Sequence, residues 1–316
     1  MDAAAQSPLP GLVPAASQQT ACVIEQVRMA RDTYRLRLEC PELARQIVPG
    51  QFFMVREQGG SDPLLGRPFA LYDIVNNDDG DPIGVDFGYV VVGKLTSRMV
   101  DWQPGDTVDI WGPLGNGFPA PPDGHLVMVA GGIGQTPFLA VTREALGQRQ
   151  YGAPPRDTPT RPGKLTLCYG ARSEEYLAGI DDFTTDGLQV RVSTDDGSHG
   201  HHGLVTDLLQ DLFLESPGPT AIYTCGPEPM MEAVAEIAAE HNTPCWASLE
   251  TPMACGFGIC FSCVTRIRLD DGQWDYRRTC VEGPVFRAES SFNCSRPVSS
   301  PACVALATSA ASVTER

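Results

Sequence analysis

The feature that most constrains the fold of this chain is a group of closely spaced cysteines near the C-terminus. Cys255, Cys260 and Cys263 are separated by four and two residues, and Cys280 follows after a further sixteen. This C-x4-C-x2-C…C spacing is typical of the thiolate ligands of a plant-type [2Fe-2S] cluster. Small residues between the ligands allow the backbone to wrap closely around the sulfurs. The spacing therefore predicts a cluster bound by these four cysteines.

A structural zinc site is the alternative interpretation of the same cysteines. Zinc knuckles usually carry C-x2-C pairs at both ends of the loop. Here the first step spans four residues, and the fourth cysteine has no partner near it in the sequence. The iron–sulfur interpretation therefore fits the spacing better.

Composition and charge argue against several classes of function. The chain has 316 residues, 42% of them hydrophobic and 20% charged, which suits two ordinary domains and a small appendage. The formal net charge of −16 argues against a nucleic-acid partner, because no basic stripe offsets it. No apolar stretch is long enough to cross a bilayer, so we expect no membrane association. The N-terminal residues lack the pattern of a secretory signal, and we expect a cytoplasmic protein.

The sequence pattern predicts a β-barrel followed by an α/β domain and a small C-terminal subdomain. Residues 21–120 contain short β-runs between Pro, Gly and Asp turns, which predicts an antiparallel barrel. Residues 121–250 alternate apolar strands with helices, which predicts a Rossmann-like parallel sheet covered on both faces. Residues 251–287 carry the cysteines and one hairpin, and such a small unit would depend on its cluster. We expect residues 1–20 and 288–316 to be flexible extensions.

Three turns in the α/β part indicate a nucleotide site. The run Gly-Gly-Ile-Gly-Gln-Thr-Pro at residues 131–137 follows a predicted strand and opens a helix, where backbone N–H groups can face a pyrophosphate. Turns at 193–198 and 224–231 fall at the C-terminal edge of the same predicted sheet, where ligands of open α/β sheets bind. The candidate NAD-binding residues are Gly131, Gly132, Ile133, Gly134, Thr136, Pro137, Asp195, Asp196, Cys225, Gly226, Pro227 and Met230.

Each of these turns also has a simpler explanation. Glycines at a strand–helix junction can serve backbone geometry alone, and an acidic turn can be an exposed surface feature. Cys225 can lie near a nicotinamide or only pack in the core. If the site exists, Asp195 or Asp196 can accept a hydrogen bond from a ribose hydroxyl, and no Arg adjoins them in the sequence to hold a 2′-phosphate. This pattern favours NADH over NADPH.

Taken in order, the motifs resemble the ferredoxin-NADP reductase superfamily. The barrel run Arg67–Tyr72, the turn Gly112–Phe118, the turn at 131–137, the Cys-Gly-Pro turn and the C-terminal cysteines follow its pattern. The cysteines placed after the nucleotide domain are, more narrowly, similar to those of the electron-transfer subunits of class B dihydroorotate dehydrogenases. The resemblance covers about residues 21–287, and the run 250–263 is its most specific part.

The resemblance implies an FAD-binding barrel and assigns its contact residues by position. The matching positions are Arg67, Pro68, Phe69 and Ala70, then Tyr89 and Val90, then Leu95 and Thr96. Two of them depart from the family pattern. Ala70 replaces a hydroxyl residue beside the flavin, and Leu95 replaces a glycine beside the diphosphate. Local contacts to the flavin are therefore expected to differ from those of the family.

The resemblance also implies a role and a partner. The chain would relay electrons between NAD⁺, FAD and the [2Fe-2S] cluster, with no catalytic nucleophile of its own. Its partner would be a catalytic dihydroorotate dehydrogenase subunit with FMN, active in pyrimidine biosynthesis, in a heterotetramer with two copies of each chain. Apolar residues beside the cluster ligands, Phe257, Ile259 and Phe261, are predicted to form the docking face.

Two alternatives remain open at this point. With the same cofactors, the chain could be the diaphorase subunit of a sulfhydrogenase or of an NADH-dependent ferredoxin:NADP oxidoreductase, and only the partner would differ. A redox-sensing binding module is a different class, in which loss of the cluster changes a protein interface. Such a module would show no turnover of NADH.

Overall fold

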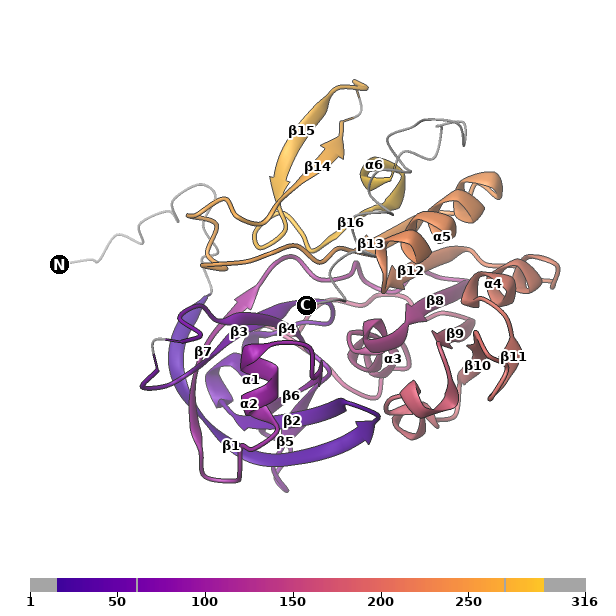
Figure 1. Ribbon diagram of the computed structural model, residues 1–316. Helices are drawn as coiled ribbons and strands as arrows, with labels where there is room; N and C mark the ends of the chain where they lie inside the picture. Colours follow the sequence, from indigo (N-terminus) through magenta and orange to yellow (C-terminus); the bar gives the residue numbers. More distant parts are fainter. Residues whose placement is uncertain (1–15, 61, 270, 293–316) are drawn as a thin grey trace, which may run out of the picture.

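The computed structural model describes residues 16–60, 62–269 and 271–292 of the chain. The extensions predicted for residues 1–15 and 293–316 lie outside this range. The described chain forms a half-barrel, an α/β domain beside it and a small cysteine-bearing unit above the junction (Figure 1). No helix among the described residues is long and apolar enough to cross a membrane.

The half-barrel is a seven-stranded sheet with antiparallel pairing throughout and the strand order β4-β3-β7-β1-β2-β6-β5. Its strands are β1 (Ser17–Ala30), β2 (Thr33–Glu39), β3 (Phe52–Glu57), β4 (Arg67–Ala70), β5 (Asp73–Asn76), β6 (Pro82–Val90) and β7 (Thr107–Leu114). Two short helices, α1 (Pro41–Gln46) and α2 (Lys94–Met99), join them. The predicted antiparallel barrel is thus confirmed as a fold class.

The barrel differs from the prediction at two places. The first strand begins at Ser17, because residues 17–20 pair with β7 from Gly112 to Asp109. These four residues are therefore ordered strand and not part of a flexible extension. Helix α1 was not predicted, although Pro41 at its first turn and the buried Leu43 form a recognisable start and an apolar face.

The α/β domain contains a mixed sheet of order β11-β10-β9-β8-β12-β13-β16. Its strands are β8 (His125–Gly131), β9 (Lys164–Ala171), β10 (Leu188–Thr194), β11 (His201–His202), β12 (Ala221–Cys225), β13 (Cys245–Ser248) and β16 (Val285–Arg287). All neighbours are parallel except β16, which pairs antiparallel with β13. The helices are η1 (Gly132–Gln135), α3 (Phe138–Ala145), η2 (Glu174–Tyr176), η3 (Ile180–Phe183), α4 (Val205–Phe213) and α5 (Glu228–Glu240).

Both faces of this sheet are buried, as expected for parallel strands. Side chains of β8 alternate between two cores: Met128 packs with Phe138 of α3 on one face, and Val129 packs with Leu209 of α4 on the other. The chain enters at β8 in the middle, builds outward to β11, and then returns to place β12 on the opposite side of β8. A topological switch point therefore lies between the ends of β8 and β12.

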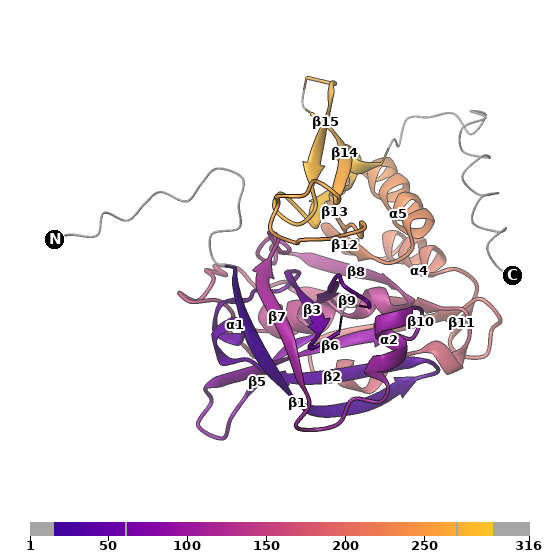
Figure 2. The same cartoon turned by 60° about the vertical axis from the view of Figure 1, so that its left-hand side comes forward.

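The C-terminal unit is a cysteine loop followed by a hairpin that projects from the body of the protein (Figure 2). The strands of the predicted hairpin are β14 (Val264–Arg268) and β15 (Trp274–Arg278). The chain then returns as β16 and α6 (Ala288–Ser291). Ala288 and Phe292 are buried against α4, α5 and the sheet. Residues 288–292 are therefore packed, and not part of a flexible tail as predicted.

Candidate functional site

The four cysteines of the predicted cluster lie in two pairs. The Sγ atoms of Cys263 and Cys280 are 3.1 Å apart, and both residues are buried. Cys255 and Cys260 form the second pair, in which the Cys255 side chain and backbone hydrogen-bond to the Cys260 thiol. Among the described residues, no three Cys, His, Asp or Glu side chains are grouped closely enough to hold a single metal ion. In a [2Fe-2S] cluster two thiolates bind each iron, and the paired cysteines fit that requirement.

Backbone and hydroxyl groups around these pairs favour thiolates. Desolvation alone would raise the pKa of the Cys260 thiol, but hydrogen bonds from Ser262 and Cys255 outweigh it and lower the pKa to about 6. At Cys280, burial raises the pKa, while the Gly258 backbone acts in the opposite direction. Thiolates are the metal-binding form of cysteine. The loop thus supplies donors of the kind that stabilise an anionic cluster.

The cysteine loop is fixed to the half-barrel by Trp111 of β7. The indole Nε1 donates a hydrogen bond of 2.8 Å to the Cys255 carbonyl, and Phe257 stacks on the ring with centroids 6.3 Å apart. On its other side the ring covers Gly66, where an added Cβ would lie only 2.5 Å from the indole. Gly66 immediately precedes the predicted FAD segment. Trp111 therefore lies between the cysteine loop and that segment.

Most of the predicted FAD residues lie on β4 and β6, two strands that are not paired in the sheet but contact each other across the half-barrel. β4 carries the Arg67–Ala70 segment, and β6 ends at Tyr89 and Val90. The rings of Phe69 on β4 and Phe87 on β6 are in contact, with their centroids 4.6 Å apart. Arg67 is exposed, and its Nη1 donates to the carbonyls of Leu65 and Gly66.

The side chains of three other predicted FAD-binding residues have structural roles within the half-barrel. Tyr89 is buried, donates to Gln26 at 2.8 Å and stacks on Tyr34. Leu95 is buried in the barrel core. The Thr96 hydroxyl accepts the backbone N–H groups of Val92 and Gly93 at 3.0 Å and so shapes the turn before α2. The residues of this set with accessible surface are Arg67, Pro68, Ala70 and Val90.

The two predicted glycine turns of the nucleotide domain meet at the switch point. An added Cβ on Gly134 would lie 2.3 Å from the Cys225 carbonyl oxygen, so only glycine allows this approach. Met230 and Pro227 pack against Gly131 in the same way. Ile133 and Thr136 face the barrel, where an added Cβ on Gly88 would lie 3.2 and 3.3 Å from their side chains. The structure thus brings the nucleotide turn beside the strand that carries Tyr89.

Two buried polar side chains in these turns have no hydrogen-bond partner among the described residues. They are the Gln135 amide and the Thr224 hydroxyl, both fully buried. Such unsatisfied groups are rare in proteins. Burial raises the pKa of the Cys225 thiol to about 12, which favours its protonated form.

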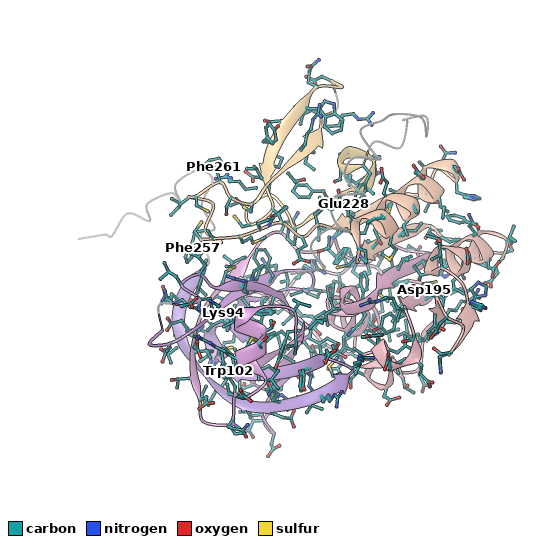
Figure 3. All side chains as sticks on the ribbon, viewed as in Figure 1. Lys94, Trp102, Asp195, Glu228, Phe257 and Phe261 are labelled. Carbon is teal, nitrogen blue, oxygen red and sulfur yellow. The ribbon has the colours of Figure 1, made fainter. Side chains whose placement is uncertain are left out.

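The predicted ribose carboxylates follow β10, at some distance from the glycine turns along the sheet edge (Figure 3). Asp195 and Asp196 donate their backbone N–H groups to the carbonyls of Ala171 and Arg172. The Arg172 backbone therefore lies beside Asp196, a neighbour that adjacency along the sequence does not reveal. The reason is that β9 and β10 are neighbours in the sheet, which places residues 171–172 beside 195–196. The Arg172 guanidinium lies 5.0 Å from the centre of the Tyr176 ring.

Trp111 and Lys94 were not predicted from the sequence. Trp111 carried no signal beyond its place before a Gly-Pro turn. Lys94, which precedes the predicted Leu95–Thr96 step (Figure 3), forms an ion pair with Asp62 at 2.7 Å. A Gly-Lys step before a short helix is the one signal by which it could have been found.

Comparisons with known proteins agree with this arrangement. Residues 250–290 match the family model described as the iron-sulfur cluster binding domain of dihydroorotate dehydrogenase B, and residues 128–236 match the oxidoreductase NAD-binding domain. A dihydroorotate dehydrogenase B (NAD(+)) electron transfer subunit from Geobacillus kaustophilus is 37% identical over 84% of this chain and 95% of that protein. An electron transfer subunit homolog from Aquifex aeolicus is 32% identical over 86% of this chain and 98% of that protein.

Solved structures with a similar fold are also found. A structure of the NADH-dependent reduced ferredoxin-NADP oxidoreductase has a TM-score of 0.70 at 28% identity, covering 85% of this chain and 88% of that one. A ferredoxin NADP⁺ reductase from Neisseria gonorrhoeae with bound FAD and NADP has a TM-score of 0.54 at 18% identity, covering 71% and 91%. The second likeness concerns the fold alone.

The fold and the matched domains together define an NAD-binding oxidoreductase of the ferredoxin reductase type with an iron–sulfur cluster binding domain. Within that class, the chain belongs to the family of dihydroorotate dehydrogenase B electron transfer subunits. The relatives in this family are named as electron transfer subunits, so the resemblance stated from the sequence is confirmed.

Proposed function

We propose that this chain relays electrons between a partner dihydroorotate dehydrogenase subunit containing FMN and NAD⁺, through its cluster and its FAD. The observation that carries the proposal is the position of Trp111, which contacts the cysteine loop through Cys255 and the FAD segment through Gly66. On the other side of the barrel, Gly88 contacts the nucleotide turn at Ile133 and Thr136. These contacts support a relay in which the three predicted cofactor sites follow one another.

Each set of residues has one task in such a relay. Cys255 with Cys260 and Cys263 with Cys280 would hold the cluster. Arg67 and the end of β6 would bind the FAD, and the turns at 131–137 and 225–230 would bind NAD(H). A flavin exchanges a hydride with a nicotinamide and single electrons with a cluster, which is the chemistry the relay requires. The chain orients these groups and excludes water.

Acidic residues at the end of β10 support NADH as the substrate in place of NADPH. Asp195 and Asp196 bond through their backbone N–H groups to Ala171 and Arg172, and the Glu174 backbone bonds to Ser198, so three acidic residues gather at this edge beside Arg172. Hydrogen bonds from Ser198 lower the pKa of Asp196, which keeps its carboxylate ionised at neutral pH. A 2′-phosphate placed here would be repelled by like charges.

Co-purification with a partner tests the proposal directly. The chain, tagged alone, is co-expressed with an FMN-containing dihydroorotate dehydrogenase subunit, and dihydroorotate-dependent reduction of NAD⁺ is measured. We expect a stable complex with activity, abolished by Cys260→Ser and retained in Cys22→Ser, which alters a thiol of β1 outside the cluster loop. The mass of the complex tests the predicted assembly of two copies of each chain. A chain that holds both cofactors but neither binds nor couples to this subunit would contradict the proposal.

A second candidate is a diaphorase subunit that serves a different partner. The structural likeness to the NADH-dependent reduced ferredoxin-NADP oxidoreductase, at 28% identity over most of both chains, favours it specifically. In that case the purified chain would bind a different catalytic subunit and would reduce its flavin with NADH without any response to dihydroorotate. The same co-purification, repeated with cell extract as the source of partners and followed by identification of the bound chain, separates the two.

A further inference from the structure

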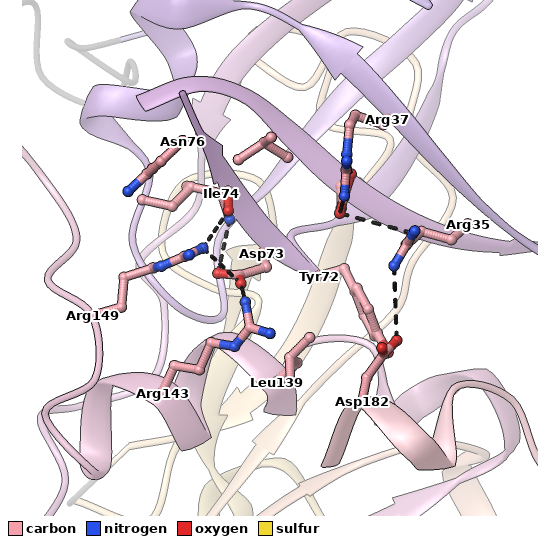
Figure 4. Close-up of a pocket in the computed structure, with 12 residues that line it drawn as sticks. Arg35, Arg37, Tyr72, Asp73, Ile74, Asn76, Leu139, Arg143, Arg149 and Asp182 are labelled. Atoms are coloured by element: carbon pink, nitrogen blue, oxygen red, sulfur yellow. Dashed lines mark hydrogen bonds and ion pairs between the residues drawn. The ribbon is translucent and has the colours of Figure 1, made fainter. Parts of the chain in front are cut away.

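The half-barrel and the nucleotide domain meet at a polar cavity of about 290 Å³ (Figure 4). The barrel side is formed by strands β2, β5 and β6, and the nucleotide side by α3, the segment after it and η3. Four arginines line this cavity: Arg35, Arg37, Arg143 and Arg149. Such a group of cations at a domain junction can serve either to bind an anion or to join the domains.

The ion pairs decide between these two roles. Arg37 binds Asp86 with two hydrogen bonds of 2.8 and 2.9 Å, and Arg35 pairs with Glu25 at 2.9 Å. The other two arginines share Asp73. Asp182 lies 4.0 Å from Arg35, so three carboxylates of the lining, with Glu25 outside it, pair with the four guanidinium groups. No surplus positive charge remains for an anion, so the cavity is an interdomain network.

Asp73 is the centre of this network. It lies on β5 of the barrel and is 2% exposed. Its carboxylate pairs with Arg143 of α3, accepts from Arg149 at 2.7 Å and accepts from the Tyr151 hydroxyl at 2.6 Å. All three donors belong to the nucleotide domain. A carboxylate so deeply buried must be paired, and the cations that neutralise it come from across the domain boundary.

A second bridge crosses the same junction. The hydroxyl of Tyr72, the residue before Asp73, donates to Asp182 of η3 at 2.7 Å. Both bridges are drawn in Figure 4, on either side of Leu139. The barrel segment 72–73 therefore contacts two separate elements of the nucleotide domain, which fixes a rotation as well as a distance.

The network acts on the nucleotide turn through α3. This helix begins directly after the 131–137 turn and carries Arg143 in its last turn. Its N-terminal end is in contact with the barrel at Gly88, and its C-terminal end is held by Asp73. Gly88 and Asp73 lie on the paired strands β6 and β5, in which Asp73 is opposite Asp86. Both ends of the helix are thus fixed to one hairpin of the barrel.

We propose that Asp73 is a positioning residue for hydride transfer between NAD(H) and the flavin: through Arg143 and Arg149 it holds α3 and the Gly132–Thr136 turn in a fixed orientation to β6. The inference rests on the proposed relay. In the transfer step the C4–H bond of the reduced nicotinamide breaks, the hydride passes to the flavin, NAD⁺ forms and the flavin is reduced by two electrons. A displacement of about 1 Å between reacting groups can cost about a hundredfold in rate.

The test uses the full chain with both cofactors and the substitution Asp73→Asn. In anaerobic stopped-flow reduction of the flavin by NADH, we expect the limiting rate to fall at least about tenfold while the Kd for NADH changes less than about threefold. The long-wavelength absorbance of the stacked nicotinamide–flavin pair should weaken in parallel. Hydrogen exchange of residues 138–146 should accelerate, because the far end of α3 is released.

Two further variants separate positioning from stability. Glu144→Gln removes a buried carboxylate from the same helix, but the partner of Glu144, Arg156, lies in the same domain. The melting temperature should therefore fall while the limiting rate of flavin reduction is unchanged. Asp73→Asn combined with Arg143→Gln also removes one of the two cations that lose their carboxylate, so the melting temperature should recover in part while the rate of flavin reduction stays low. Equal loss of rate in Glu144→Gln and Asp73→Asn would overturn the inference.

The outcomes for this inference and for the relay can be told apart. A wild-type chain whose flavin is not reduced by NADH would contradict the relay itself. Unchanged hydrogen exchange of α3 in Asp73→Asn would overturn the positioning role whatever the activity. An unchanged limiting rate with faster exchange would also overturn it, because the tether would then be structural only.

Discussion

The indole nitrogen of Trp111 donates a 2.8 Å hydrogen bond to the backbone carbonyl of Cys255, 144 residues later in the chain. Trp111 is nearly buried, and Phe257 of the cysteine loop stacks on it. Through Gly66 the same ring lies against the segment that begins at Arg67. One side chain of the barrel therefore sets where the cluster lies relative to the flavin segment.

The first prediction concerns this hydrogen bond. Trp111→Phe keeps an aromatic ring but removes the donor, at a cost of about 1 kcal/mol, so a chelator should remove the cluster about fivefold faster. The bleaching of the cluster absorbance measures this rate, with flavin content as the reference. Trp246→Phe, which alters a ring of the nucleotide domain, should leave the rate unchanged. Equal rates in wild type and Trp111→Phe would contradict the role given to this contact.

The second prediction concerns the paired cysteines. Cys263→Ser and Cys260→Ser should each abolish the cluster, because a plant-type [2Fe-2S] cluster is held by four thiolates. FAD should remain bound, since its predicted residues lie on β4 and β6. Metal analysis and the absorbance of the purified chain measure both cofactors. Cys168→Ser, at a buried thiol of the sheet, is the matched control and should cost stability but not iron.

Local patterns explain how much of the fold could be predicted from the sequence. Cys255, Cys260 and Cys263 lie within one short loop, so their spacing can be recognised whatever fold surrounds the loop. Strand β8 could also be predicted from the sequence, because both of its faces are buried and its residues form one apolar run. The glycine turn after it follows from the strand–helix junction alone.

Long-range pairing explains what could not be predicted. Arg172 and Asp196 are adjacent only because β9 and β10 are neighbours in the sheet. No local sequence pattern predicts the order of the strands in a sheet. The same holds for Trp111 with Cys255. Asp73 gave no signal either, since the donors that neutralise it begin 70 residues later, at Arg143.

The third prediction concerns the close approach of the two glycine turns. Gly134→Ala would place a Cβ 2.3 Å from the Cys225 carbonyl and must push the turns apart, at a cost of about 1–3 kcal/mol. Since NAD(H) is proposed to bind across these turns, we expect NADH affinity to fall about tenfold or more. Titration of NADH against the flavin spectrum measures it. Gly163→Ala, where the nearest atom is 3.7 Å away, is the control; unchanged affinity in Gly134→Ala would contradict the site.

The fourth prediction concerns pH. His125 at the start of β8 is fully buried with its Nε2 2.9 Å from the Thr166 hydroxyl. Burial, with a smaller contribution from Lys164, lowers the pKa of His125 below 6.5. The unfolded chain therefore binds a proton at a higher pH than the folded one. The stability contributed by the neutral imidazole is complete above about pH 6.5 and is lost as the pH falls below that value.

Urea unfolding at a series of pH values checks this sign. The free energy of unfolding of the wild type should decrease between about pH 7 and about pH 5, and His125→Gln should show a shallower decrease. His202→Gln, at an exposed position, should follow the wild type. A wild type that gains stability over this interval would contradict the argument.

The fifth prediction concerns the docking face, where the structure divides the three residues predicted from the sequence. Phe257 is half-buried against Trp111, whereas Ile259 and Phe261 are 67% and 60% exposed on either side of Cys260 (Figure 3). Ile259→Ala and Phe261→Ala should therefore lower partner-dependent turnover about tenfold, because exposed apolar anchors of this kind carry much of the energy of an interface. Reduction of the flavin by NADH should be unchanged. Phe257→Ala should act differently, by loosening the cluster as Trp111→Phe does. If all three variants reduced both activities equally, the face would be part of the cluster site and not a docking surface.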